Sequence, residues 1–445
     1  MKMAWILTLA AAAAWGADQG VERGPLPLSL KRAVEIATSH EGNTSLQLAG
    51  EALKQAQARS SEARGALLPD VEAGFTDRSE TENLAALGLR SITIPIPGFQ
   101  FPTFVGPFTT ADLRVTGQQS IFDFSTIRRF QASKAGVSAA KSDVDGTAEQ
   151  VAAQVVRAYL AAVKADADVE TAQANVDLSQ ALLKQSENEK AAGTGTGIEV
   201  TRARVQLAND RQHLLEAQTA GRAAHLRLLR AMNMRLDTEL ELTDKLRYEP
   251  VDVVTLEQAR KQALGTRPDY RAQQERERTA QLSASAAKME RLPSVAAFGD
   301  YGTIGTGVDS LLPTRTYGIA VKVPLFDGGR RDARRAESAS QYRAEKSRTS
   351  DLKEQIELDV RLALDSLSSA GEEVQVAKEG LDLAENELAQ ARRRYDAGVA
   401  TGVEVTDAQT RLERARDNQT AALYSYNVAR IDLAQAMGRV RSTVQ

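Results

Sequence analysis

The chain has 445 residues with 56 basic and 59 acidic side chains, so its formal charge of −3 is nearly balanced. No acidic or basic tail stands out, which gives no electrostatic support for a nucleic-acid partner. Cysteine is absent, which excludes disulfides, zinc thiolate sites, a thiol nucleophile and the lipid-anchoring cysteine of a bacterial lipoprotein.

The N-terminus has the pattern of a secretory signal peptide. Lys2 precedes an apolar run from Ala4 to Ala14, and small residues follow. We predict that residues 1–17 are a cleaved signal peptide, because the run is shorter than the roughly 20 residues that span a bilayer. A retained anchor helix is the alternative. No later apolar run reaches that length, so we expect an exported chain without a transmembrane helix.

After a short leader, helical stretches begin near Ser29 and Thr255, and the two stretches resemble each other. Each breaks, at Gly42 and at Pro268, and resumes as an Ala-, Gln-, Glu- and Arg-rich helix that ends in Leu-Pro. Ser29 is suited to cap the first of these helices. This similarity indicates an internal duplication.

Beyond each Leu-Pro the periodicity changes from helical to twofold, which is typical of strands. Two strands are expected per copy, and these are residues 71–76, 113–122, 295–299 and 317–325. Between the first two lies an insertion, residues 79–111, whose apolar part is rich in Pro. Pro at this density argues against a central strand or helix. We interpret the insertion as a long loop, with a ligand-binding loop as the alternative.

Two long helical hairpins follow the strands. Residues 125–190 and 330–396 are Pro-free stretches, each long enough for a helix of about 100 Å at 1.5 Å per residue. The returning helices, 199–232 and 404–437, are about half as long. The helices that precede the strands could supply the missing length by stacking end to end with them.

Each hairpin turns at a Gly-Thr segment that occurs twice, at residues 192–203 and 397–408. Gly supplies the tight-turn conformations, and Thr followed by Glu suits the first turn of the next helix. The residues expected at these tips are Gly193, Thr194, Thr196, Gly197, Gly398, Thr401 and Gly402.

Four strands in an exported chain leave two free edges, and a membrane admits only sheets whose edges are closed. The smallest usual transmembrane barrels need about eight strands. Several chains must therefore pool their strands. The sequence predicts a strand barrel in a membrane, continuous with a long helical tube or bundle.

At this point the chain resembles the TolC-like outer-membrane efflux protein family, the outer membrane factors of tripartite efflux or type I secretion systems. The matching features are the duplication, the Leu-Pro-x-Val segments at 68–71 and 292–295, the Pro-Leu-Phe-Asp-Gly-Gly-Arg corner at 324–330 and the Gly-x-x-Thr tips. The resemblance covers the chain from about Leu28 to Gly438.

The resemblance implies an α+β membrane protein that forms a homotrimer. Each chain would give four strands to a twelve-stranded outer-membrane β-barrel, continuous with a periplasmic α-helical barrel, and residues 28–233 and 255–438 would be the two structural repeats. The expected function is a passive exit duct without enzymatic activity or cofactor. The implied partners are outer-membrane lipid, a periplasmic adaptor (membrane fusion) protein at the tips, and an inner-membrane transporter of RND, ABC or MFS type.

In this family, carboxylates line the periplasmic aperture just beyond the tips. Glu404 and Asp407 occupy such positions, and Glu199 is the counterpart in the first copy, where Arg202 replaces the second carboxylate. Three chains would form a ring that favours cations. The alternative is that these acids only stabilise helix N-termini, by a few tenths of a kcal/mol.

Other sequence features are weaker. No nucleophile elbow, P-loop or His-Glu-x-x-His motif occurs, so no catalytic or metal site is expected. The Arg pairs at 128–129, 330–331 and 334–335 follow the strands, where they could face anionic lipid head groups or simply be solvated.

Two other protein classes carry long helices, a periplasmic adaptor and a structural coiled-coil protein. The first would have one hairpin and compact β-domains, and the second does not explain the duplicated strand corners.

Overall fold

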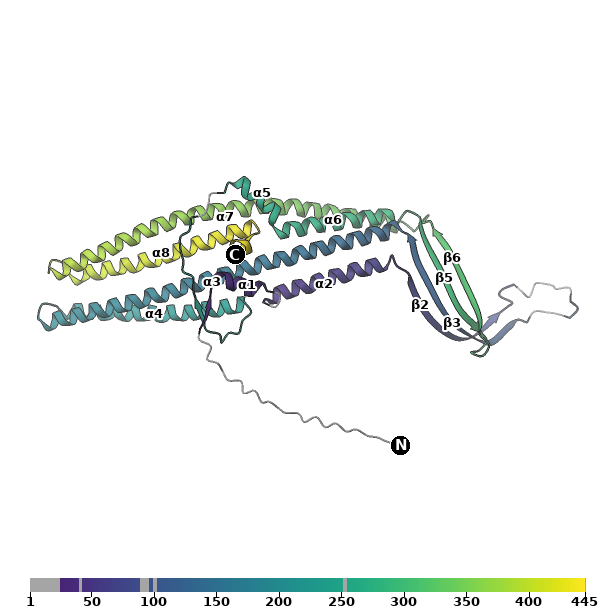
Figure 1. The fold of residues 1–445 in the computed structure, drawn as a ribbon, viewed down its shortest axis with the longest axis horizontal. Coiled ribbons are helices and arrows are strands. Elements are labelled where there is room, and N and C mark those ends of the chain that lie inside the picture. The colour runs from purple at the N-terminus through teal and green to yellow at the C-terminus, as the bar shows by residue number, and fades with distance from the viewer. Residues whose placement is uncertain (1–24, 40–41, 89–95, 99–101, 251–253, 445) are drawn as a thin grey trace, which may run out of the picture.

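The computed structural model describes residues 25–39, 42–88, 96–98, 102–250 and 254–444. The chain is elongated, with a long helical body at one end and a four-stranded sheet at the other (Figure 1). The same order of elements occurs twice along the chain. The first series is α1 (Leu30–Thr38), α2 (Thr44–Gly65), β2 (Asp70–Asn83), β3 (Phe104–Phe122), α3 (Phe124–Ala191) and α4 (Gly197–Ala231). The second is α5 (Leu256–Thr266), α6 (Pro268–Met289), β5 (Ser294–Gly305), β6 (Leu312–Lys322), α7 (Arg330–Asp396) and α8 (Gly402–Ala436), and a short α9 (Val440–Val444) ends the chain.

Helices α3 and α7 run the whole length of the helical body. They have 68 and 67 residues, which corresponds to about 100 Å each. Helix α4 packs along the tip half of α3 and α2 along its sheet half, and α8 and α6 divide α7 in the same way (Figure 1). The predicted helix spans and the end-to-end stacking are thus confirmed.

The short helices start and stop where local signals place them. The Ser29 hydroxyl accepts a hydrogen bond from Arg32 N at 3.3 Å, and the Asn43 side chain accepts one from Ser45 N at 2.8 Å. Pro268 occupies the first turn of α6, where no backbone N–H is needed. Asn43 also donates to the Ala231 carbonyl at 3.2 Å, which joins the start of α2 to the end of α4.

The helices pack through narrow seams of small residues. In the middle of α3, Val151, Val155, Tyr159 and Val163 form a buried stripe. Nearer the sheet, Val137 and Val144 of the same helix are only partly buried. There the buried apolar residues are Ala132, Ala135, Ala139 and Ala148. Helix α3 packs there against both α2 and α6, and Ala allows helices to approach more closely than Val does.

A small belt crosses the middle of the helical body, and the sequence did not predict it. Strand β1 (Leu26–Leu28) pairs in parallel with β4 (Leu240–Leu242). The Tyr159 hydroxyl lies 2.8 Å from the Leu28 carbonyl oxygen and 2.7 Å from Asp244 Oδ2. Burial, and then the Asp244 carboxylate, raise the pKa of Tyr159, so the hydroxyl remains a donor. The belt is therefore attached to the core of α3.

The sheet has the order β2-β3-β5-β6, and all its neighbouring strands are antiparallel. Cross-strand register gathers apolar side chains on one face, including the pairs Phe75–Leu113 and Val115–Tyr301. These side chains are exposed, as are Tyr317 (81%) and Ile319 (68%) of β6. The other face carries Asp112, Arg114, Thr116, Asp300 and Thr316. Among the described helices, none has the length and apolar character needed to cross a bilayer.

The strands of the first hairpin are longer than expected. Strand β2 continues to Asn83 and β3 begins at Phe104, so both ends of the predicted insertion 79–111 are paired strand, and the interpretation of the insertion as a loop is wrong at these two ends. Pro107 lies within β3 at an irregularity in its pairing with β2, and β5 pairs with β3 only from Ala111 onward. Among the described strands, this part of β3 therefore has β2 as a neighbour on one side and none on the other that would need the missing N–H.

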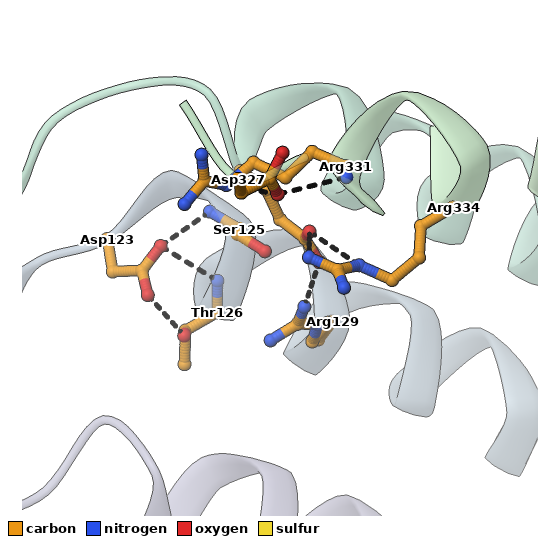
Figure 2. A network of polar contacts seen from close by, with 8 residues as sticks. Asp123, Ser125, Thr126, Arg129, Asp327, Arg331 and Arg334 are labelled. Atoms are coloured by element: carbon orange, nitrogen blue, oxygen red, sulfur yellow. Dashed lines mark hydrogen bonds and ion pairs between the residues drawn. The ribbon is translucent and has the colours of Figure 1, made fainter. Parts of the chain in front are cut away.

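Polar contacts fix the corner where the sheet joins the helices (Figure 2). The Asp123 carboxylate caps α3 by accepting hydrogen bonds from Ser125 N at 2.9 Å and Thr126 N at 3.3 Å. Just after α6, Glu290 accepts hydrogen bonds from Arg129 of α3 and from Arg334 of α7, the latter at 2.8 Å. Two of the predicted basic pairs thus each contribute one Arg to a contact that holds three helices together.

We predict that Tyr159→Phe lowers the stability of the helical body. Loss of the hydroxyl removes the single donor that lies between the Leu28 carbonyl and the Asp244 carboxylate, which costs about 1–2 kcal/mol. Thermal unfolding of the purified protein, followed by circular dichroism, measures the change. Tyr342→Phe, on a half-buried residue of α7, is the matched control, and an equal loss in both variants would contradict the prediction.

Candidate functional site at the hairpin tips

Both hairpins turn through a glycine in the left-handed conformation. Gly193 has φ +78° and Gly398 has φ +71°, a region that other L-residues rarely adopt. After the first glycine, Thr194 N and Gly195 N both donate to the Glu189 carbonyl, at 3.0 and 2.9 Å. These bonds satisfy the end of α3 and reverse the chain within a few residues.

A threonine occupies the N-cap position of each returning helix. The Glu199 carboxylate accepts a hydrogen bond from Thr196 N at 2.9 Å, which completes a capping box at the start of α4. Thr401 is the cap residue of α8. The predicted tip residues all lie in or next to these two turns. Gly193, Thr194, Thr196, Gly197, Gly398 and Thr401 are exposed, and Gly402 is half-buried.

The three predicted aperture carboxylates lie at the same end of the molecule, but their surroundings differ. Glu199 serves the cap of α4, and its carboxylate lies beside Gly402 of the other hairpin. Glu404 forms an ion pair with Arg394 of α7 at 3.0 Å. Asp407 is exposed one turn further along α8. Glu199 therefore stabilises the start of α4, Glu404 is paired with Arg394 and Asp407 is exposed, and the role of the three acids at an aperture stays a prediction.

The two hairpins touch directly near their tips, through residues that the sequence did not single out. The Tyr395 hydroxyl of α7 donates to the Glu189 carboxylate of α3. Gln185 Nε2 donates to Asp396 Oδ1 at 3.2 Å. Burial, and then Glu189, raise the pKa of Tyr395, so it stays a donor. The sequence signal that could have identified this contact is Tyr395 itself, a single aromatic residue that follows three Arg residues at the end of α7.

A cavity lies between the hairpins beside these contacts. Its lining comes from α3, α4, α7 and α8 and includes Leu182, Glu199, Arg202, Tyr395 and Gln409. The hairpins are therefore joined near the tips by a few polar contacts around an incompletely filled space, beside an apolar contact of Leu178 and Leu182 with α7 and α8. In the described part of the chain, no group of three or more His, Cys, Asp or Glu side chains is placed to hold a metal ion.

Known proteins resemble this chain in sequence. The model of the outer membrane efflux protein family matches residues 36–234 and 259–439. The pyoverdine export outer membrane protein OpmQ of Pseudomonas putida is 26% identical over 92% of this chain and 85% of its own length. The alkaline protease secretion protein AprF of Pseudomonas aeruginosa is 24% identical over 70% of this chain, a match that spans 66% of AprF.

Solved structures share the fold. The outer-membrane channel OprN aligns with a TM-score of 0.79 at 19% identity, over 92% of this chain and 89% of OprN. The outer membrane protein VceC of Vibrio cholerae aligns with a TM-score of 0.78 at 19% identity, over 92% of this chain and 96% of VceC. The duplicated helix and strand order, the uncovered apolar face of the sheet and the family match over most of the chain agree: the protein belongs to the outer membrane efflux protein family.

Proposed function

We propose that this protein is the outer-membrane exit duct of a tripartite efflux or type I secretion system. It would passively conduct substrates from an inner-membrane pump and a periplasmic adaptor to the cell exterior. The observation that carries this proposal is a sheet with an exposed apolar face that continues, through fixed corners, into helices of about 100 Å. Such a chain can join a membrane to a distant partner.

The free strands β2 and β6 indicate how the barrel would close. They are the outer strands of the sheet, and in a membrane their unpaired backbone groups need partners. We propose a homotrimer in which β6 of one chain pairs with β2 of the next, giving twelve strands. In the same proposal, residues 28–233 and 255–438 are the two structural repeats that form the wall of the helical duct.

The tips suit the docking of an adaptor. They are exposed, lie at the end opposite the sheet (Figure 1) and consist of small residues, so another helical hairpin could approach their backbone closely. OpmQ and AprF are named for different cargo, pyoverdine and an alkaline protease. This supports a duct whose cargo is selected by its RND, ABC or MFS partner.

In this proposal the duct transforms no substrate and needs no cofactor. The two rival protein classes fit the structure less well. A periplasmic adaptor would have no use for a sheet with an uncovered apolar face, and neither would a structural coiled-coil protein, because each would expose that face to water. The apolar face is suited to lipid.

Bulky side chains at the tip should block adaptor docking. We expect Gly398→Val together with Thr401→Trp to abolish export, because they strain the left-handed turn and cover its exposed surface. Export in cells and trimer assembly in detergent are measured in parallel. Lys346→Trp, at an exposed position of α7 far from the tip, should leave export unchanged. Normal export by the tip variant would remove the tip from the adaptor interface.

Neutralising the aperture carboxylates should reduce cation preference in planar-bilayer conductance. We expect Glu404→Gln with Asp407→Asn to lower the ratio of cation to anion permeability, with most of the effect from Asp407, because Glu404 is already paired with Arg394. Asp382→Asn, on an exposed acid of α7, is the control. Unchanged ion selectivity in the double variant would disprove the carboxylate ring.

Removal of the Tyr395 hydroxyl should favour separation of the hairpins. Tyr395→Phe deletes the hydrogen bond to Glu189, and a hydrogen bond to a charged group of about 1.5 kcal/mol corresponds to about tenfold in a two-state equilibrium. We therefore expect the conductance without adaptor to rise by up to about that factor. Glu189→Gln should act in the same direction, and conductance equal to that of the unmodified protein in both variants would contradict the link.

A further inference from the structure

A second polar connection between the hairpins lies deeper than the tips and is fully enclosed. It sits about 18 Å from the end of α3, twelve residues at 1.5 Å each. Ser179 of α3, Asp210 of α4 and Gln409 of α8 are 1%, 3% and 1% exposed. The Ser179 hydroxyl donates to the Asp210 carboxylate, and Gln409 Nε2 donates to Ser179 Oγ at 2.8 Å. The cluster therefore connects both hairpins.

A second carboxylate borders this cluster from the other hairpin. Glu413 lies one turn beyond Gln409 on α8, and its Oε1 accepts from Gln409 Nε2 at 3.2 Å. Asp210 has two side-chain donors, Ser179 and Gln206, the latter at 3.0 Å. Glu413 and the Ser179–Asp210 pair thus depend on the same Gln409 amide. Asp210 thus accepts two side-chain hydrogen bonds, whereas Glu413 accepts one, from an amide that it shares with Ser179.

The Gln409 amide also leaves an acceptor unused. Gln409 Oε1 is buried and has no hydrogen-bond partner within the described part of the chain. A buried carbonyl oxygen without a donor is costly. A protonated Glu413 could supply the missing donor, because it is the neighbour of this amide on the same helix face. The cluster would then be complete with one proton added.

Charges from every adjoining helix act on this position. On α4 they are Asp210 and His213, and on α8 the nearby acid is Asp417. Lys164 and Asp168 of α3 act on Asp417 in turn, and on α7 Glu387 is paired with Arg411 of α8. Burial first, and then the charge of Asp210, raise the pKa of Glu413 to about 7. The negative charge of Asp210 thus raises the pKa of Glu413 more than His213 lowers it.

We propose that Glu413 is a proton-binding site that holds the α3–α4 hairpin against the α7–α8 hairpin when protonated and releases it when ionised. Protonated Glu413 leaves a single carboxylate charge, on Asp210, and adds a donor for Gln409 Oε1. Ionised Glu413, which is partly exposed at the border of the buried cluster, places a second negative charge near Asp210, and the two charges repel each other across the boundary between the hairpins. Only the consequence for opening of the duct rests on the proposed function.

The direction of the pH effect follows from linkage. When the hairpins separate, Glu413 returns to water and to an ordinary pKa near 4.5, whereas in contact it has a pKa of about 7. The contact between the hairpins is therefore most favourable at and below a pH of about 4.5. It weakens as the pH rises from about 4.5 to about 7 and stays weak above that. Because Glu413 is partly exposed, we expect a change on the order of tenfold in the ratio of joined to separated hairpins.

The distance between the hairpins tests this proposal directly. The chain has no cysteine, so Arg211→Cys on α4 and Gln390→Cys on α7, both exposed, can each carry a spin label in the purified full chain. We expect two label-to-label distances, a shorter one for joined hairpins and a longer one for separated hairpins. The population with the longer distance should increase when the pH is raised from 5.5 to 8.5. Glu413→Gln should keep the shorter distance at both pH values. The same pH response in Glu413→Gln, or none in the unmodified sequence, would overturn the proposal.

Two further measurements complete the test. Glu385→Gln, on an exposed acid of α7, is the matched control and should respond to pH like the unmodified chain. The infrared band of the protonated Glu413 carboxyl group is identified by its absence in Glu413→Gln. In the unmodified sequence this band should disappear as the pH is raised through about 7. Disappearance of the band already below pH 5 would also overturn the proposal. Neither experiment needs an adaptor, a pump or export. If Glu413 does not control the contact between the hairpins, the proposed duct function is therefore unaffected. If the duct function itself is wrong, the purified protein should instead show no conductance.

Discussion

The architecture depends on one constraint, which is that the four-stranded sheet is incomplete in a single chain. Its apolar face is uncovered, and its two outer strands, β2 and β6, present unpaired backbone groups. In a bilayer both deficits are removed only by lipid on the face and by strand partners at the edges. The directions of α3 and α7 depend on the sheet, because these helices start at the corners that follow β3 and β6. The direction of the whole helical body is therefore set at the sheet.

The corners transmit that direction through polar contacts. Asp123 caps α3, and Glu290 receives an Arg from α3 and another from α7. Further along, packing relies on Ala and Val seams that bring the helices close without a thick core. The belt held by Tyr159 fixes the middle of the body. The long, thin helical body is thus held by polar contacts at the sheet and at the belt.

Beyond the belt, Leu178 and Leu182 of α3 pack against apolar residues of α7 and α8, and the α3–α4 and α7–α8 hairpins are otherwise linked through separate polar contacts. From the belt to the tips these include Arg157–Asp432, Ser179–Gln409 and Tyr395–Glu189. Polar links of this kind can break and re-form with water as the competitor, whereas an apolar seam would resist separation. The tip half of the molecule is therefore the part best suited to a change between two arrangements, and Glu413 lies in that half.

Local signals in the sequence determined the helices, the tips and the presence of two strands per repeat. Pro-free Ala-rich stretches, Gly-Thr turns and twofold alternation depend only on neighbouring residues. The tertiary structure alone decided what joins distant segments. Strand β1 finds β4 more than 200 residues away, and Pro107 fits within β3 because β5 begins its pairing only at Ala111. The Ser179–Asp210–Gln409 cluster and the Tyr395–Glu189 bond require a particular rotation of one hairpin against the other. No short segment encodes that rotation, because it results from the packing of all the helices together.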